Sequence, residues 1–498
     1  MSSELQSLLN EASRHLGKGD NVSAQACLEK VLELDGKHFD ALHILGVLAH
    51  RAGQTDRALD LIAQALAVNP DFPEAHFNHG KILHDAGRAA EAVAAYERAL
   101  ALRPEWDAAL FNLGLLYARQ KGWARAADCF EQAIRINAAD AEYFFNLGNV
   151  RLEMGEREAA IRAFEESLAR DPSKFKAHNN LGNLYKQSGD FKRAAASYEA
   201  ALRLDPGYAG AWYNLGNLSE QQADPDRALE HYRKAVECDP SFAKAYNNMG
   251  NVYHQLKQYD RALEAYRQAV KTDPTLDSSR HMINSLTGSQ PESAPAAYVA
   301  SLFDRAAPDF EQRLVGDLKY RIFQELKAAV RKLAGEGHRF GRGVDLGCGT
   351  GLAGREFRPL AEVLEGVDLS SKMIELARKN SIYDACHCRD IVGFLKESAE
   401  RFDLFIAADV LVYLGNLNAL FAAVKKCARQ GALWAFSTER SEEENFRLQP
   451  SGRFAHSRTY IADLAKKHGF SVEFQQNTVI RTENDRPIPG DNFILKAG

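Results

Sequence analysis

The sequence predicts two folds in tandem, an α-helical solenoid of stacked hairpins and then an α/β domain with a parallel sheet. Two observations support this prediction. The first half of the 498-residue chain repeats with a period of 34 residues, and a fixed period of that length is typical of stacked helical hairpins. The second half alternates short apolar strands with helices, and a glycine-rich turn at residues 347–351 joins one strand to a helix.

The period of 34 is visible at three positions that stay in step. Glycine recurs at one of them, as Gly46, Gly80, Gly114, Gly148, Gly182, Gly216 and Gly250. Alanine recurs from Ala58 to Ala262 with a large side chain four residues later, and proline recurs from Pro70 to Pro274. Small residues allow two helices to approach closely, positions four apart share one helix face, and proline ends each unit.

This pattern resembles the tetratricopeptide repeat (TPR) family over residues 39–276, and a degenerate leading unit extends the resemblance back to about residue 5. The resemblance implies about eight helical hairpins, stacked into a superhelix with a concave groove. With a capping helix over residues 275–287, the solenoid is predicted to cover residues 1–286. Residues 287–296 are rich in Ser, Pro and Gly and predict a linker, and residues 297–498 would form the second domain.

The predicted groove carries a column of asparagines. They stand two residues before the recurrent glycine in six units, as Asn78, Asn112, Asn146, Asn180, Asn214 and Asn248. An amide offers both a donor and an acceptor, so such a column can pair with an extended peptide backbone. The column resembles the asparagine ladder of the O-linked N-acetylglucosamine transferases, which implies a protein or peptide partner. Asparagine is also a common filler at this repeat position, so a purely structural role stays open.

The candidate chemistry lies in the second half. The strand Gly343–Leu346 leads into the glycine-rich turn, and the segment 349–354 also fits the dinucleotide pattern GxGxxG. Asp345 at the strand end would repel a pyrophosphate and can face a cationic amino group. Asp368 ends the second strand, where it can accept hydrogen bonds from ribose hydroxyls, and a third strand is expected to end at Asp390. These carboxylates favour a sulfonium nucleoside over a nicotinamide dinucleotide.

The run VDLGCGTG…GVDLS…RDI, within residues 343–391, resembles the class I S-adenosylmethionine-dependent methyltransferases. The resemblance implies a Rossmann-like domain that takes S-adenosylmethionine as its cofactor, with adenine near the end of the third strand. It implies this set of cofactor-binding residues: Asp345, Gly347, Cys348, Gly349, Gly351, Asp368, Leu369, Met373, Asp390, Ile391, Ala408 and Asp409.

The remaining elements fit the same fold. A fourth strand is expected at 402–407, a fifth at 431–437, a helix at 458–468, and a closing antiparallel pair at 470–481 and 490–496. Upstream, residues 298–320 resemble the helical lid of bacterial TPR-fused methyltransferases of the trans-aconitate and biotin-pathway type. His456 and Tyr413 are the catalytic candidates, since a hydroxyl or amine acceptor can require proton removal. The alternatives are that His456 caps a helix and that Tyr413 packs.

Three functions stay open. The first is a methyltransferase whose solenoid recruits a protein or peptide partner or substrate. The second is a small-molecule methyltransferase, with a carboxyl or hydroxyl acceptor, that uses the solenoid for assembly. The third is a scaffold whose methyltransferase domain senses the cofactor or is inactive.

Composition narrows the partners and the location. The net charge of −5 gives no basic field, so nucleic acid is not an implied partner. The most apolar stretch, residues 402–424, is interrupted by polar residues, so we expect no membrane span. Residues 1–14 have neither a cationic n-region nor an apolar h-region, so we expect no signal peptide. Seven scattered cysteines argue against a disulfide framework and for a cytoplasmic location. Cys386-His387-Cys388 alternates faces on a strand, so no metal site is expected there.

Overall fold

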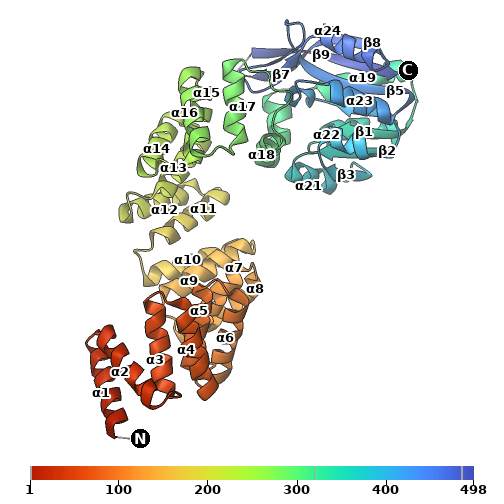
Figure 1. The fold of residues 1–498 in the computed structure, drawn as a ribbon. Helices are drawn as coiled ribbons and strands as arrows, with labels where there is room; N and C mark the ends of the chain where they lie inside the picture. The colour runs from red at the N-terminus through yellow and green to blue at the C-terminus, as the bar shows by residue number, and fades with distance from the viewer. Residues whose placement is uncertain (1–2, 319, 484–485) are drawn as a thin grey trace. The chain divides into compact units, whose positions relative to one another are not determined.

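The computed structural model describes residues 3–318, 320–483 and 486–498. The chain divides into two compact units, Met1–Cys238 and Asp239–Gly498. The first unit consists of helices, and the second joins three helices to an α/β domain (Figure 1). The predicted fold class, an α-solenoid followed by a Rossmann-like α/β domain, is confirmed.

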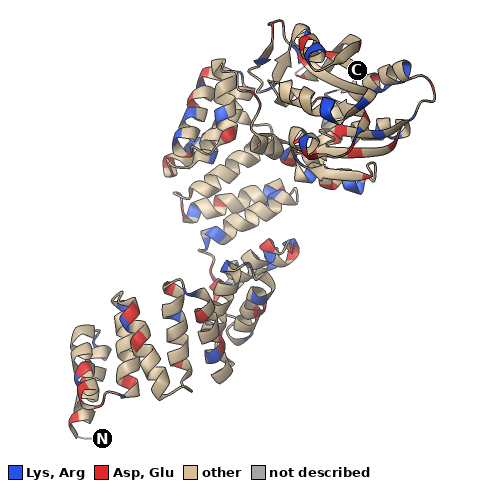
Figure 2. Cartoon of the chain, turned by 45° about the vertical axis from the view of Figure 1, so that its right-hand side comes forward, with Lys and Arg blue, Asp and Glu red and all other residues tan. Residues whose placement is uncertain are grey.

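The first unit is a series of helical hairpins. Its helices are α1 (Ser3–Gly17), α2 (Asn21–Leu34), α3 (Phe39–Arg51), α4 (Thr55–Val68), α5 (Pro73–Asp85), α6 (Ala89–Leu102), α7 (Asp107–Arg119), α8 (Trp123–Ile136), α9 (Ala141–Glu153), α10 (Arg157–Arg170), α11 (Phe175–Gln187), α12 (Phe191–Leu204), α13 (Ala209–Gln221) and α14 (Pro225–Cys238). Charged residues of both signs are interspersed along them (Figure 2).

The recurrent glycine has a clear packing reason. A Cβ added at Gly216 would lie 2.4 Å from Cε1 of Tyr232, the large residue four positions beyond the recurrent alanine. Tyr232 and Ala228 are fully buried, so the ring fills the space between the two helices of its own hairpin. The same close approach recurs in every unit from Gly46 to Gly250. Glycine is therefore required by volume at this position rather than by backbone conformation.

The second unit begins with three helices of the repeat region and continues into the α/β domain. Its elements are α15 (Ala243–Gln255), α16 (Tyr259–Thr272), α17 (Asp277–Thr287), α18 (Ala296–Ala306), η1 (Ala307–Asp309), η2 (Gln312–Asp317), α19 (Ile322–Ala334), β1 (Phe340–Leu346), α20 (Leu352–Phe357), η3 (Arg358–Leu360), β2 (Ala361–Asp368), α21 (Ser371–Lys379), β3 (Ala385–Cys388), α22 (Ile391–Glu397), β4 (Phe402–Ala407), η4 (Leu411–Tyr413), α23 (Asn418–Cys427), β5 (Ala428–Arg440), β6 (Phe446–Leu448), β7 (Phe454–His456), α24 (Arg458–Lys467), β8 (Phe470–Glu483) and β9 (Arg486–Ala497).

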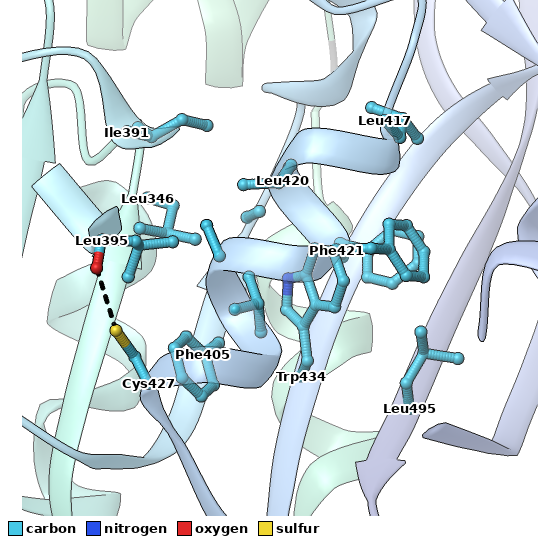
Figure 3. Packing of buried hydrophobic residues seen from close by; sticks show 14 of the residues in the cluster. Leu346, Ile391, Leu395, Phe405, Leu417, Leu420, Phe421, Cys427, Trp434 and Leu495 are labelled. Atoms are coloured by element: carbon cyan, nitrogen blue, oxygen red, sulfur yellow. Dashed lines mark hydrogen bonds between the residues drawn. The ribbon is translucent and has the colours of Figure 1, made fainter. Parts of the chain in front are cut away.

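The sheet has the strand order β3-β2-β1-β4-β5-β7-β6, and β9 pairs with both β5 and β8. Strands β1 to β5 are parallel, whereas β9 runs antiparallel to β5 and β8. One core lies around Trp434, whose ring meets Phe421 edge to face at 4.7 Å, and Cys427 Sγ donates to the carbonyl oxygen of Leu395 beside it (Figure 3). This core fixes the sheet, and the strand order places a switch point between β1 and β4.

One local expectation needs correction. The third strand ends at Cys388, and Asp390 instead caps α22, since its Oδ1 accepts a hydrogen bond of 2.7 Å from Gly393 N. The short hairpin β6–β7 was not expected. The lid region consists of helix α18 followed by the two short helical turns η1 and η2.

The segment between α17 and α18 is attached to the α/β domain and is not a free linker. The carbonyl oxygen of Glu292 accepts hydrogen bonds from Gly415 N and Asn416 N, each 2.8 Å long. Ala294 N donates to the carbonyl oxygen of Tyr413 at 2.9 Å. These bonds tie the entry to the lid to the segment that follows β4.

Candidate functional site

The candidate site is a cavity of about 450 Å³ at the carboxyl ends of the parallel strands. Its floor comes from the loops after β1, β2 and β4, and further lining residues come from segments 293–318 and 320–323. Ligands of open α/β sheets bind at this edge, where the strand order reverses. A volume of this size is typical of a small-molecule site.

The glycine-rich turn forms one wall of the cavity, through Gly347, Cys348, Gly349 and Thr350. Gly347 has φ +79°, and a Cβ there would lie 2.2 Å from Cγ2 of Val410. Glycine at this position is therefore needed for both backbone conformation and space. Thr350 Oγ1 is buried and has no hydrogen-bond partner among the described residues. The turn thus offers an unused polar atom to a ligand.

Asp368 lies at the carboxyl end of β2 and lines the cavity. Its Oδ2 accepts from Gly349 N at 2.9 Å, and its Oδ1 accepts from Ser370 N at 2.8 Å. Burial raises the pKa of this carboxyl, and these backbone hydrogen bonds oppose the shift. Each oxygen has a second lone pair, so the fixed carboxylate can accept two further hydrogen bonds from a ligand.

The neighbouring loops complete the predicted floor. Leu369, Asp390 and Ile391 line the cavity beside Asp368, and Ala408 and Asp409 line it after β4. Asp409 has φ +58°, which is rare for a residue other than glycine. Asp409 N donates to Ser437 Oγ at 3.0 Å, and that bond holds the residue where β4 turns into the cavity.

Three predicted cofactor residues do not line the cavity. Asp345 is 1% exposed, and its Oδ2 accepts a hydrogen bond of 2.7 Å from Tyr383 Oη. Asp345 contacts Tyr383 instead of lining the cavity, which corrects its expected placement, and burial raises its pKa to about 7. A role for Asp345 toward a ligand stays a prediction. Met373 is fully buried, and Gly351 precedes α20 with φ +103°.

The two catalytic candidates differ in placement. Tyr413 lines the cavity, its ring meets Phe303 edge to face at 5.4 Å, and burial raises its pKa to about 12. His456 is 1% exposed and does not line the cavity. Its Nε2 donates to the carbonyl oxygens of Leu414 and Gly415, at 2.8 and 3.2 Å, and burial lowers its pKa to about 4. The assignment of His456 as catalytic is therefore corrected, because its ring is committed to holding the chain after β4.

Two arginines of the site, the buried Arg481 and the half-buried Arg453, were missed from the sequence. Arg481 and Arg453 both line the cavity. Arg481 pairs with Asp409 Oδ1 at 3.3 Å and with Glu439 and Glu483 at 2.5 Å each. Arg453 Nη1 lies 3.6 Å from the same two glutamates, beyond hydrogen-bonding distance. In the sequence, Arg453 is visible only as a cationic residue three positions before His456, and nothing there indicates that its side chain points into the cavity.

The asparagine column was also located in the structure. The amide nitrogen of each of five members is a hydrogen-bond donor: Asn78 to His43, Asn112 and Asn146 to the backbone of their own helices, Asn180 to Asn149 and Asn214 to Asn179. Asn248 Oδ1 accepts from Asn247 at 3.2 Å. The side-chain oxygens of the first five accept no hydrogen bond from any described residue. These oxygens are therefore available to donors from outside.

The described ranges contain neither a candidate metal site nor a candidate membrane-spanning helix. Within residues 3–318, 320–483 and 486–498, no group of three or more His, Cys, Asp or Glu side chains could hold a metal ion. Among the helices built from those same residues, none is both long enough and apolar enough to cross a membrane.

Comparisons with known proteins match both halves of the chain. Tetratricopeptide-repeat family models match residues 15–76, 51–105, 77–142, 145–209, 180–241 and 243–276, and a methyltransferase-domain model matches residues 318–475. The malonyl-[acyl-carrier protein] O-methyltransferase of Enterobacter lignolyticus is 30% identical over 140 residues, 28% of this chain and 53% of that protein. The enzyme of the same name from Chlorobium phaeovibrioides is 28% identical over 188 residues, 36% of this chain and 71% of that protein. The chain therefore spans about half the length of the first of these relatives.

Two of the solved structures similar to this chain are tetratricopeptide repeat proteins. YrrB, described as a TPR protein with an unusual peptide-binding site, is 24% identical, with 37% of this chain and 95% of that chain covered and a TM-score of 0.34. A tetratricopeptide repeat protein from Parabacteroides merdae is 20% identical, with 53% and 100% covered and a TM-score of 0.38.

Proposed function

The chain joins tetratricopeptide repeats to a methyltransferase domain, and on that premise we propose that it transfers the methyl group of S-adenosylmethionine to a carboxylic acid. The observation that carries this proposal is the cavity itself. Asp368 and the glycine-rich turn line one part of it, and Arg453 lines another. The curated relatives are named as O-methyltransferases that act on a malonyl group, which supports a carboxyl acceptor.

The residues present fit S-adenosylmethionine. Asp368, Asp390 and Asp409 line the cavity together with Arg453 and Arg481, so the lining carries one more negative than positive charge. That balance suits a ligand with a sulfonium and an amine against one carboxylate. Asp368 would accept from the ribose hydroxyls, Ile391 and Leu369 would flank the base, and Thr350 Oγ1 would gain a partner.

The bound cofactor supplies an electrophilic methyl group that needs no further activation. The chain's own residues then have two tasks, to exclude water and to orient the acceptor. Phe303 and Phe310 lie in the cover of the cavity and meet edge to face at 5.9 Å, so they keep that part apolar. A carboxylate acceptor is already nucleophilic and needs no general base, which agrees with the removal of His456 from the site.

Arg453 supports an anionic acceptor. Its Nη1 is buried, and the carboxylates of Glu439 and Glu483 lie 3.6 Å from that atom. No described residue forms a hydrogen bond with its side chain. An arginine with unused donors at a cavity wall suits the two oxygens of a carboxylate. Arg481 is already paired with three carboxylates and is therefore a support for Asp409 rather than a second anion site.

The cofactor assignment is tested by calorimetry with S-adenosylmethionine on the full chain. Asp368→Ala should weaken binding by about 10- to 100-fold or more, since it removes hydrogen bonds to a charged acceptor worth about 1.5–3 kcal/mol each. Glu362→Ala is the matched control, because Glu362 is an exposed residue of the same strand. Equal affinity in the wild type and Asp368→Ala would overturn the cofactor assignment.

The acceptor class is tested by transfer of labelled methyl groups to malonyl-acyl-carrier protein and to small dicarboxylic acids. Arg453→Lys keeps the charge but loses the bidentate fork, so it should raise the acceptor KM while S-adenosylmethionine affinity stays unchanged. An acceptor KM in this variant equal to that of wild type would contradict the carboxylate proposal. Tight cofactor binding with no transfer to any acceptor would favour the third function, a cofactor-sensing scaffold.

A second function, recruitment of a protein or peptide by the asparagine column, is supported by the unused oxygens of the first unit. Because the amide nitrogens are committed as donors, the column presents acceptors for the N–H groups of an extended chain. Replacing Asn146, Asn180 and Asn214 with Ala should weaken the binding of extended peptides without unfolding. Replacement with Asp retains the acceptor oxygens and serves as the control. Unchanged peptide binding in the Ala variant would leave the column a structural role.

The location proposed for this enzyme is the cytoplasm. All seven cysteines are free thiols, including the exposed Cys238 and Cys388. Exposed free thiols suit a reducing compartment.

A further inference from the structure

The β6–β7 turn, residues 449–453, connects two short strands and carries Arg453 into the cavity. Inside the turn, Gly452 N donates to the carbonyl oxygen of Gln449 at 2.9 Å, and Gln449 N donates to that of Arg453 at 2.8 Å. Strands β6 and β7 have three residues each. A hairpin this short gains little stability from its own ladder, so its position depends on what it contacts.

Two histidines from the same unit bind this turn, one on a helix of the last repeat and one on the capping helix that follows it. His254 on α15 donates from Nε2 to the carbonyl oxygen of Pro450 at 2.7 Å. His281 on α17 donates from Nε2 to the carbonyl oxygen of Gly452 at 2.7 Å, and that ring is 1% exposed. The two donors grip carbonyls two residues apart, directly before Arg453. These two hydrogen bonds therefore fix the backbone of the turn. A surface that only packed against apolar side chains would not need hydrogen bonds to backbone carbonyls.

The surroundings of His281 extend the grip to the lid. Its ring lies 4.9 Å from that of Tyr298, which belongs to α18. A Cβ at Gly452 would meet Met282 Sδ at 3.1 Å and Tyr298 Oη at 3.6 Å, so the turn is closely enclosed. On the far side of the turn, the Arg453 guanidinium lies 6.0 Å from the ring of Tyr413.

We propose that α15 and α17 act as positioning elements for the acceptor site, with His254 and His281 holding the turn that places Arg453. This inference rests on the proposed role of Arg453 as the carboxylate anchor. It assigns the last repeat of this chain a part in methyl transfer that goes beyond partner recruitment. Because the acceptor site is then built partly from repeat helices, a change in α15 or α17 alters acceptor binding without touching the cofactor residues.

The test uses full-length variants and two readouts. His254→Ala removes one donor at a half-buried position, and His281→Leu removes the other while keeping an apolar side chain. His254→Gln retains an amide donor and is the conservative variant. His84→Ala is the matched control, because His84 occupies the position of His254 five repeats earlier in the first unit, and its Nε2 accepts a hydrogen bond from Arg119.

The expected result is increased deuterium uptake of residues 446–456 in His254→Ala and His281→Leu, with wild-type uptake in His84→Ala. With malonyl-acyl-carrier protein as the acceptor probe, the acceptor KM should rise about threefold to tenfold per lost neutral hydrogen bond. The dissociation constant for S-adenosylmethionine should stay within twofold of wild type, and His254→Gln should recover most of the KM.

The two proposals fail separately. Unchanged uptake of residues 446–456 in both His254→Ala and His281→Leu would overturn the positioning role, whatever the activity. Raised uptake with an unchanged acceptor KM would overturn it as well, because the turn would then move without consequence. Absence of methyl transfer by the wild type, together with raised uptake in the variants, would instead overturn the acceptor proposal and leave the contact between repeat helices and turn established.

Discussion

Asp345 gives a sharp test of the electrostatics beneath the glycine-rich turn. Its carboxyl is buried under the turn, burial raises its pKa to about 7, and Tyr383 Oη and Gly354 N oppose the shift by donating to it. In the unfolded chain the same group titrates near 3.8. The folded protein therefore keeps a proton that the unfolded chain has lost, and stability falls as pH rises from about 4 to about 7.

The magnitude follows from the size of the shift. Each pH unit between the two pKa values changes the unfolding free energy by about 1.4 kcal/mol. Asp345→Asn removes the titration and keeps a carbonyl oxygen to accept from Tyr383. Any fixed cost of burying the amide is independent of pH. The free energy of unfolding of the variant, relative to that of wild type, should therefore increase by about 3 kcal/mol between pH 5 and pH 8. Within this interval, wild type loses stability only below the folded pKa of Asp345, that is over about two pH units.

The assay is a urea titration read by deuterium uptake of residues 340–368, which reports unfolding of this sheet rather than of the helical repeats. Asp384→Asn is the control. Asp384 accepts from Leu364 N at 2.7 Å, and its pKa is lowered by hydrogen bonds and Arg358 against the opposing effect of burial. That carboxyl is ionised throughout the range, so its variant should differ from wild type equally at pH 5 and pH 8. A constant difference for Asp345→Asn would refute a protonated carboxyl beneath the turn.

Three further predictions concern packing, backbone strain and an unpaired hydroxyl. Gly216→Ala should destabilise its hairpin by about 1–3 kcal/mol, since the new Cβ lies 2.4 Å from Tyr232, and Tyr232→Leu in the same chain should recover part of the loss in a thermal melt. Ala223→Gly should raise the melting temperature, because Ala223 has φ +57° at a turn position where four other repeats have Gly53, Gly87, Gly155 and Gly189; a lower value would contradict this. Thr350→Val should stabilise the ligand-free protein by about 1 kcal/mol, through loss of a buried unpaired hydroxyl, and should weaken S-adenosylmethionine binding in calorimetry; unaltered affinity would exclude Thr350 from the site.

Much of the fold was predictable because its determinants are periodic or local. The 34-residue register is a volume constraint that each hairpin repeats, so Gly216 and Tyr232 report the same contact as their counterparts in other units. Strand 402–407 is a mostly apolar run, and strand 470–483 begins with alternating apolar residues, Phe470, Val472 and Phe474. The β6–β7 hairpin escaped detection because strands of three residues carry no measurable periodicity. The segment 287–296 has the composition of a linker, although its backbone is bonded to the residues after β4.

The site was predictable only where residues follow strands in the chain. Asp368 and Asp390 come at or just beyond strand ends, and the parallel sheet brings those ends to one edge. Asp345 also ends a strand, yet its side chain turns toward Tyr383 beneath the turn, and sequence alone does not distinguish the two sides of a strand buried on both faces. Arg453 and Arg481 reach the cavity through tertiary packing, from segments more than 100 residues after the glycine-rich turn.

Strain and unused hydrogen-bonding capacity meet at this cavity, and that coincidence argues for a ligand. Among the described residues other than glycine, five have positive φ, and the only one that lines the cavity is Asp409. Arg481 holds Asp409 there through an ion pair, so the strained backbone is supported by a buried charge network. Thr350 Oγ1 and Arg453 Nη1 both belong to the lining of the cavity and are buried without hydrogen bonds. Strained backbone and unpaired buried polar groups persist where a bound ligand supplies the missing partners. A binding site needs polar groups that the protein itself leaves without hydrogen bonds. Ligand binding would therefore stabilise the residues that line the cavity. In an inactive domain that no longer binds a ligand, nothing would favour leaving these polar groups unpaired.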